Sequence, residues 1–132
     1  MRLKKTLLIV DDEELVCRGI LRSFKRCFDE VYFATHPEDA ERILKQTAVT
    51  NLVCDYHLGE GVPRGTELME RWRRAYPQIR KAVLYSGADL STVTSSCVDS
   101  KISKSLPIHS LFHAVLSDEA QEASSISNEF SV

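Results

Sequence analysis

Residues 7–14, with the sequence LLIVDDEE, place a continuous apolar run directly before four acidic residues. A short apolar run without alternation is typical of a parallel strand that is covered on both faces. Further runs occupy residues 31–34, 52–54 and 82–85, and a weaker one lies around Ile102. The sequence therefore predicts five strands, of which the first, third and fourth are the most buried.

Between these runs, apolar residues repeat with the period of a helix at residues 16–28, 37–44, 68–76 and 108–116. Pro107 suits the start of the last helix. A weaker, short helix is expected at residues 88–97, where a run of Ser and Thr has little helix propensity. Strands that alternate with helices predict right-handed crossovers and a doubly wound parallel sheet.

The second and fifth strands are the weakest and are expected at the edges of this sheet. This placement agrees with the flavodoxin-like strand order 2-1-3-4-5 and predicts an α/β fold of five strand–helix units, (βα)5. The 132 residues are enough for one such domain. We predict it over residues 5–117, followed at residues 118–132 by a polar tail that we expect to be disordered.

Composition argues against several classes of protein. A net charge of -2 gives no reason to expect nucleic acid or an anionic membrane as a partner. Only four apolar residues follow the basic start MRLKK, whereas a secretory signal needs roughly 7–15 and a membrane span about 18. The four scattered cysteines are interpreted as small buried side chains in a reducing cytoplasm. In RWRR, residues 71–74, Trp72 is interpreted as a core residue and the arginines as a solvated helix surface.

Side chains with useful chemistry follow the predicted strands. Asp11 and Asp12 follow the first strand, Asp55 the third, Ser86 the fourth and Lys104 the fifth. Ligands of a doubly wound sheet bind beyond the carboxyl ends of its strands, so we expect these groups to converge. Crowded carboxylates repel one another, and a hard divalent cation such as Mg²⁺ relieves the repulsion. A cation and a lysine can neutralise a phosphoryl group in transfer while one carboxylate acts as the nucleophile.

The motifs LLIVDDEE, LVCDYHL, AVLYSG and SKS, in this order, resemble those of bacterial response-regulator receiver domains. The resemblance covers roughly residues 5–117 and implies that Asp55 accepts a phosphoryl group. The donor would be the phosphohistidine of a sensor histidine kinase or of a phosphotransfer protein. Ser86 is then the switch hydroxyl, and Lys104 pairs with the phosphoryl group.

The resemblance also implies a site for Mg²⁺ or Mn²⁺. Asp12 would bind the cation directly and Asp11 through a water molecule. Asp55 and the backbone carbonyl of His57 would complete the protein ligands.

A receiver domain would be a cytoplasmic signalling domain and not an enzyme, and it would act by changing its contacts with a downstream protein. Two positions depart from the family: Lys101 stands where an aromatic residue is frequent, and Ser105 where proline is usual. A phosphorylation-independent pseudo-receiver that only binds partners is therefore an alternative. A phosphatase is a weaker one, because His57 stands where such enzymes generally carry a second aspartate.

Overall fold

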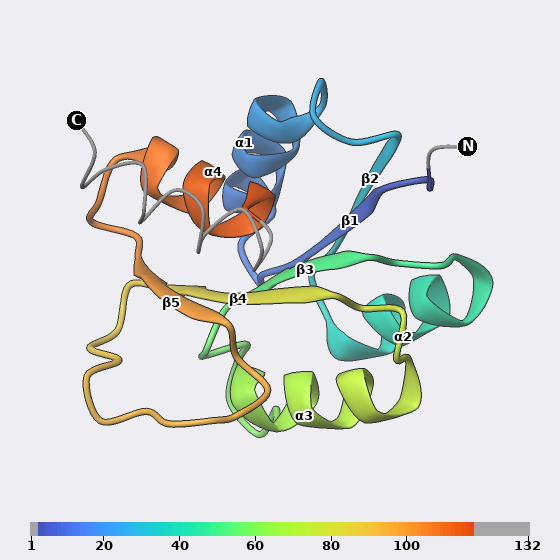
Figure 1. Cartoon of the computed structure of the whole chain (residues 1–132). Helices are drawn as coiled ribbons and strands as arrows, with labels where there is room; N and C mark the ends of the chain where they lie inside the picture. Colours follow the sequence, from blue (N-terminus) through green and yellow to red (C-terminus); the bar gives the residue numbers. More distant parts are fainter. Residues whose placement is uncertain (1–2, 118–132) are drawn as a thin grey trace.

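The computed structural model describes residues 3–117, in which five parallel strands form one sheet between two layers of helices (Figure 1). The strands are β1 (Thr6–Val10), β2 (Glu30–Ala34), β3 (Asn51–Cys54), β4 (Lys81–Ser86) and β5 (Ser100–Ser103). The helices are α1 (Glu14–Phe24), α2 (Pro37–Gln46), α3 (Gly65–Ala75) and α4 (Ile108–Leu116). The sheet order β2-β1-β3-β4-β5 confirms the predicted order, with the two weakest strands at the edges.

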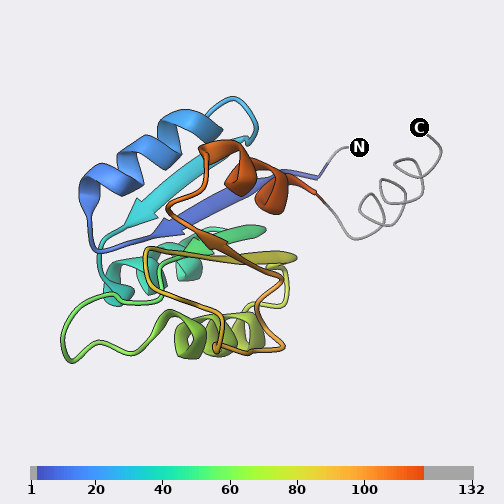
Figure 2. The same cartoon turned by 90° about the vertical axis from the view of Figure 1, so that its left-hand side faces the viewer.

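Helices α1 and α4 cover one face of the sheet, and α2 and α3 cover the other (Figure 2). Along β1, Leu7 and Ile9 belong to the cluster under α1 and α4, whereas Leu8 and Val10 belong to the cluster with Trp72 of α3. Both faces of β1, an interior strand of the sheet, are therefore buried. This explains why its sequence is a continuous apolar run and not an alternating one.

The register of the central strands aligns their carboxyl ends. Val10 of β1 pairs with Ala34 of β2 and with Cys54 of β3. The next residues continue the ladder, because the Asp55 N–H donates to the Val10 carbonyl at 2.9 Å and the Asp11 N–H to the Ala34 carbonyl at 3.2 Å. The two acidic residues that follow β1 and β3 are thus placed by backbone pairing at the same edge of the sheet.

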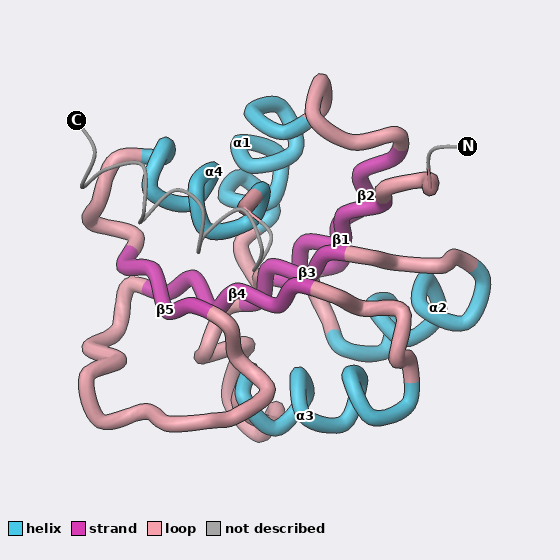
Figure 3. Tube along the Cα trace, in the orientation of Figure 1, coloured by secondary structure: helices cyan, strands magenta, loops and turns pink. Residues whose placement is uncertain are grey.

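No helix forms between β4 and β5, and the prediction of a helix at residues 88–97 is wrong. Residues 87–99 consist of turns, bends and irregular stretches (Figure 3), so the fold has four of the five helices of a (βα)5 unit. The guanidinium of Arg73 in α3 donates to the Cys97 carbonyl at 3.0 Å and to Asp99 Oδ2 at 2.9 Å. A Ser- and Thr-rich stretch gains little from helix formation, and these side-chain contacts hold it in an irregular path instead.

The same contacts correct the interpretation of the RWRR cluster. Trp72 is buried, as predicted, and its indole N–H donates to Glu41 Oε2 at 3.1 Å. Arg73 is not a solvated residue, because its side chain is only 21% exposed and forms an ion pair with Asp99.

The cysteines follow the prediction in part. All four are free thiols, and Cys17 and Cys54 are buried. Cys27 is exposed, because α1 ends at Phe24 and Cys27 lies in the turn that follows. Within residues 3–117, no helix has the length and apolar character needed to cross a membrane. The predicted tail at residues 118–132 lies outside the described residues.

Candidate functional site

Three carboxylates meet at the carboxyl ends of β1 and β3. Asp11, Asp12 and Asp55 each offer an oxygen atom, and these atoms all lie within 4.8 Å of one another. Asp11 is 2% exposed and Asp55 is 7% exposed, whereas Asp12 is exposed to solvent. Two buried acids and one accessible acid thus surround a single point at the edge of the sheet.

Lys104 brings a positive charge to this cluster. Its Nζ donates to Asp11 Oδ2 at 2.7 Å and to Asp55 Oδ2 at 3.3 Å. The lysine is positioned by the sheet, since its backbone N–H donates to the Ser86 carbonyl at 2.9 Å just beyond the pairing of β4 with β5. The ammonium therefore bridges the two buried carboxylates from an edge strand.

The electrostatics of the cluster are unbalanced toward negative charge. Burial raises the pKa of Asp11, and the hydrogen bonds from Lys104 and from the Glu13 N–H only partly offset that effect. Burial alone would lower the pKa of Lys104, but Asp11 and Asp55 outweigh it and raise that pKa. Lys104 is consequently held as a cation, while the carboxylates gain from any further positive charge.

The donor set fits a hard divalent cation. Carboxylate oxygens are the ligands that Mg²⁺, Mn²⁺ and Ca²⁺ favour. The neighbouring thiol of Cys17 donates to the Asp11 carbonyl at 3.3 Å, and burial raises its pKa to about 12. This sulfur stays protonated at neutral pH, so the site offers no thiolate ligand there for a softer metal.

Ser86 ends β4 and is buried beside this edge of the sheet. Its Oγ accepts a hydrogen bond from the Ala88 N–H at 3.2 Å, so the side chain closes the turn that begins residues 87–99. The residue that ends β4 thus also fixes the start of the irregular segment that replaces a helix.

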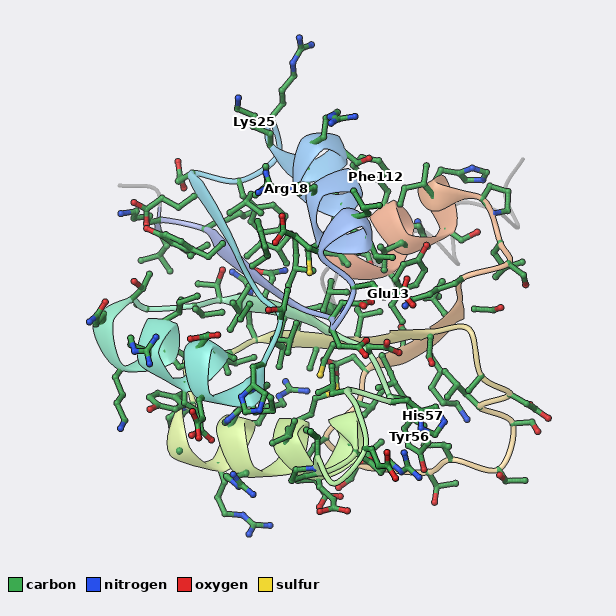
Figure 4. All side chains as sticks on the ribbon, turned by 180° about the vertical axis from the view of Figure 1, so that it is seen from behind. Glu13, Arg18, Lys25, Tyr56, His57 and Phe112 are labelled. Carbon is green, nitrogen blue, oxygen red and sulfur yellow. The ribbon has the colours of Figure 1, made fainter. Side chains whose placement is uncertain are left out.

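The loop after β3 forms the other side of the site. His57 is exposed, its Nδ1 contacts Arg64 Nη1, and its ring lies edge-on to Tyr56 with 4.7 Å between ring centroids. Figure 4 shows Tyr56 and His57 together near α3, with Glu13 on the opposite side at the start of α1. The guanidinium of Arg64 also lies 5.6 Å from the centroid of the Tyr56 ring. Arg64 was not among the predicted site residues.

Gly65 is a second residue that the sequence did not single out. Its N–H donates to the Tyr56 carbonyl at 2.8 Å. A Cβ atom at this position would lie 2.1 Å from the carbonyl oxygen of Asp55. Only glycine allows the start of α3 to approach the backbone of Asp55 so closely. The sequence signal that could have indicated this close approach is a glycine that follows a long loop and begins a helix.

The chain superposes on solved response regulators. A response regulator from Burkholderia pseudomallei matches with a TM-score of 0.75 and 18% identity, over 95% of this chain and 74% of that chain. A CheY-like receiver domain from Methanospirillum hungatei JF-1 matches with a TM-score of 0.72 and 23% identity, over 84% of this chain and 90% of that chain. The fold is that of a response-regulator receiver domain.

Another receiver structure is the response regulator TrrA from Thermotoga maritima, with a TM-score of 0.71 and 21% identity over 83% of this chain and 94% of that chain. TrrA was solved in complex with Mg²⁺ and beryllium fluoride, and the Burkholderia protein with a phosphorylated aspartic acid and a calcium ion. The sequence itself matches no protein-family model and no curated protein. At these identities, the likeness lies in the receiver fold.

Proposed function

We propose that this chain is a receiver domain that accepts a phosphoryl group on Asp55 with the help of Mg²⁺ or Mn²⁺. The observation that carries the proposal is the Lys104 ammonium, which bridges the buried carboxylates of Asp11 and Asp55 within a group of three acids. A structural ion pair needs one carboxylate per ammonium. The excess of acids instead fits a site that binds a cation and handles an anionic group.

Asp55 is the nucleophile in this proposal. One oxygen of its carboxylate attacks the phosphorus of a phosphohistidine, the bond from phosphorus to the imidazole nitrogen breaks, and the nitrogen keeps the electron pair. Lys104 donates to Oδ2 of Asp55 and orients the carboxylate. Its positive charge then stabilises the phosphoryl oxygens, and the Ser86 hydroxyl is available to donate to one of them.

The cation would be held by the carboxylates of Asp11, Asp12 and Asp55 and by the backbone carbonyl of His57. A bound divalent cation supplies positive charge that offsets the carboxylates and the oxygens of the transferred group. The pKa of Asp11 is raised chiefly by burial, and a bound divalent cation would favour the charged form of this buried carboxylate.

The phosphodonor in this proposal is a sensor histidine kinase or a phosphotransfer protein in the cytoplasm, and the output is an altered contact with a downstream protein. Solved structures that share the fold include response regulators, which are signalling proteins. The chain would not be an enzyme with a substrate of its own beyond accepting and losing its phosphoryl group.

Intact-mass measurement after incubation with Mg²⁺ and a small phosphodonor, such as acetyl phosphate or phosphoramidate, tests the proposal. The wild-type chain should gain the mass of one phosphoryl group, and chelation with EDTA should prevent the gain. Asp55→Asn should show none. Asp39→Asn, which changes an exposed acid on α2 paired with Arg42, should behave like the wild type.

A wild-type chain that gains no mass from any donor would refute phosphorylation and favour the alternative, a pseudo-receiver that only binds partners. The irregular segment at residues 87–99 and the lysine at position 101 favour that alternative, because both alter the surface next to β5. It predicts partner binding that is unchanged by Asp55→Asn.

A further inference from the structure

Tyr85 of β4 places an aromatic ring beside the ammonium of Lys104. Lys104 Nζ lies over this ring, 5.9 Å from its centroid. The distance is within the range of about 6 Å over which the electron-rich face of an aromatic ring attracts a cation. The ammonium therefore has a neighbour that attracts it besides the carboxylates of Asp11 and Asp55.

The pairing of β4 with β5 explains how the ring reaches the site. Tyr85 pairs with Ile102, and both side chains pack in the cluster under α1 and α4. Side chains two positions apart share a face of a sheet, so Lys104 follows Ile102 on the face that carries Tyr85. Tyr85 is only 8% exposed. Its ring thus extends the apolar cluster to the edge of the charged site.

The contact joins a cation to a neutral ring and is not an ion pair. Burial raises the pKa of the Tyr85 phenol, so the phenol keeps its proton at neutral pH. Lys104 is charged, because Asp11 and Asp55 outweigh the effect of burial and raise its pKa. The attraction therefore depends on the electron density of the ring face and not on a charged oxygen.

Such a contact suits a lysine that has to move during the proposed reaction. The hydrogen bonds of Lys104 to Asp11 at 2.7 Å and to Asp55 at 3.3 Å each depend on the position of one oxygen atom. A ring face has no single acceptor atom, so an ammonium can shift over it and keep most of the attraction. When Lys104 follows a phosphoryl group on Asp55, its contact with Asp11 weakens and the contact with the ring remains. The ring thus restrains the ammonium most in the state in which transfer occurs.

We propose that Tyr85 is a positioning residue, whose ring keeps the Lys104 ammonium in place while a phosphoryl group is transferred to Asp55. The proposal rests on the proposed function and adds to it a residue that acts through Lys104. Packing alone would accept any large apolar side chain at position 85, whereas positioning needs an electron-rich ring face. The two roles therefore differ in how the reaction depends on the electron density of the ring.

Fluorinated phenylalanines at position 85 test this dependence, because each added fluorine withdraws electron density from the ring face and changes its size little. The full chain is incubated with phosphoramidate and Mg²⁺, and intact mass follows the rate of phosphorylation. Tyr85→Phe should react nearly as fast as the wild type. The rate should then fall stepwise with mono-, di- and trifluorophenylalanine, by about fivefold for the last, which corresponds to about 1 kcal/mol. Tyr85→Leu, which has no ring, should lose at least as much.

Phe24 provides the matched control for fluorination. It is a buried ring of the same cluster, and its aromatic neighbours are Phe28 and Phe112. Trifluorophenylalanine at position 24 should leave the rate unchanged. A rate that does not respond to fluorination at position 85, or that falls as much on fluorination at position 24, would overturn the positioning role.

Urea unfolding in EDTA tests the contact without phosphoryl chemistry. Trifluorophenylalanine at position 85 should lower the free energy of unfolding more in the otherwise wild-type chain than in a Lys104→Met background, which lacks the ammonium. An equal effect in both backgrounds would overturn the contact itself. A wild-type chain that gains no phosphoryl group would instead refute the proposed function, and with it the role of Tyr85 in transfer, even where unfolding supports the contact.

Discussion

Replacing Gly65 with alanine should destabilise the chain and displace the backbone that carries Asp55. The added Cβ would lie 2.1 Å from the Asp55 carbonyl oxygen, 3.0 Å from its carbon and 3.2 Å from Leu84 Cδ1. The two nearest atoms are backbone, so α3 or the end of β3 must move. Overpacking of this kind costs about 1–3 kcal/mol, and rigid neighbours place it near the upper end. The better helix propensity of alanine offsets at most about 1 kcal/mol, which leaves a net loss of about 2 kcal/mol or more.

Gly19 provides the matched control, because it lies within α1 and a Cβ there would meet nothing within 4 Å. Gly19→Ala should stabilise the chain by about 0.5–1 kcal/mol. Urea unfolding followed by the fluorescence of Trp72, the single tryptophan, measures both variants. Phosphoryl acceptance by Gly65→Ala, measured by intact mass where the variant is folded, should also fall. Equal stability of Gly65→Ala and wild type, with normal acceptance, would show that the close approach of α3 to Asp55 is not required.

Two further predictions concern charge and access. Because burial raises the pKa of Asp11 above its ordinary 3.8, its ionisation opposes folding as pH rises through that range. In EDTA, Asp11→Asn should therefore raise the free energy of unfolding at pH 7, and this gain should shrink toward pH 4. Added Mg²⁺ should instead stabilise the wild type more than the variant. Urea titrations measure both effects, and a gain that does not depend on pH would contradict burial of the charge as the cause. Iodoacetamide should alkylate Cys27 and, more slowly, Cys97 in the folded chain, whereas Cys17 and Cys54 should react only after unfolding, because both are buried and burial raises the pKa of both thiols. Adducts counted by intact mass check this, and a modified Cys17 in folded protein would refute it.

The strand order and the acidic cluster could be predicted because each follows from a short sequence pattern that determines how whole strands are arranged in the sheet. A continuous apolar run indicates a strand buried on both faces, and its neighbours in a parallel sheet all end at the same edge. The residue after each run is therefore placed without knowledge of any side-chain contact. This is why Asp11, Asp55 and Lys104 could be brought together from the sequence, and the structure places their charged atoms within hydrogen-bonding distance.

The path of residues 87–99 could not be predicted in the same way. Its Ser and Thr residues indicate only weak helix propensity, and the outcome depends on Arg73 and Lys101, which lie in other elements. The periodicity of α3 assigned Arg73 to a solvated face, because a helical pattern does not reveal a loop that folds over it. Gly65 was not predicted as a site residue for a related reason. Its contact with Asp55 is between backbone atoms, so it leaves no pattern of side chains in the sequence.

The charge balance of the site explains why a phosphoryl group on Asp55 would need a divalent cation and a neutral donor such as the Ser86 hydroxyl. Three carboxylates outnumber the one ammonium that the structure places among them, and Lys104 is shared between Asp11 and Asp55. Phosphorylation as proposed replaces the charge of Asp55 with that of a phosphoryl group, which is larger and projects further from the strand. Lys104 can follow this charge only by weakening its contact with Asp11, and a divalent cation becomes the main partner left for that buried carboxylate. The remaining phosphoryl oxygens then need neutral donors, and the hydroxyl of Ser86 can serve as one, because it accepts from the Ala88 N–H and keeps its own proton to donate. Cation binding and a hydrogen bond from the Ser86 hydroxyl are thus two consequences of the same shortage of positive charge.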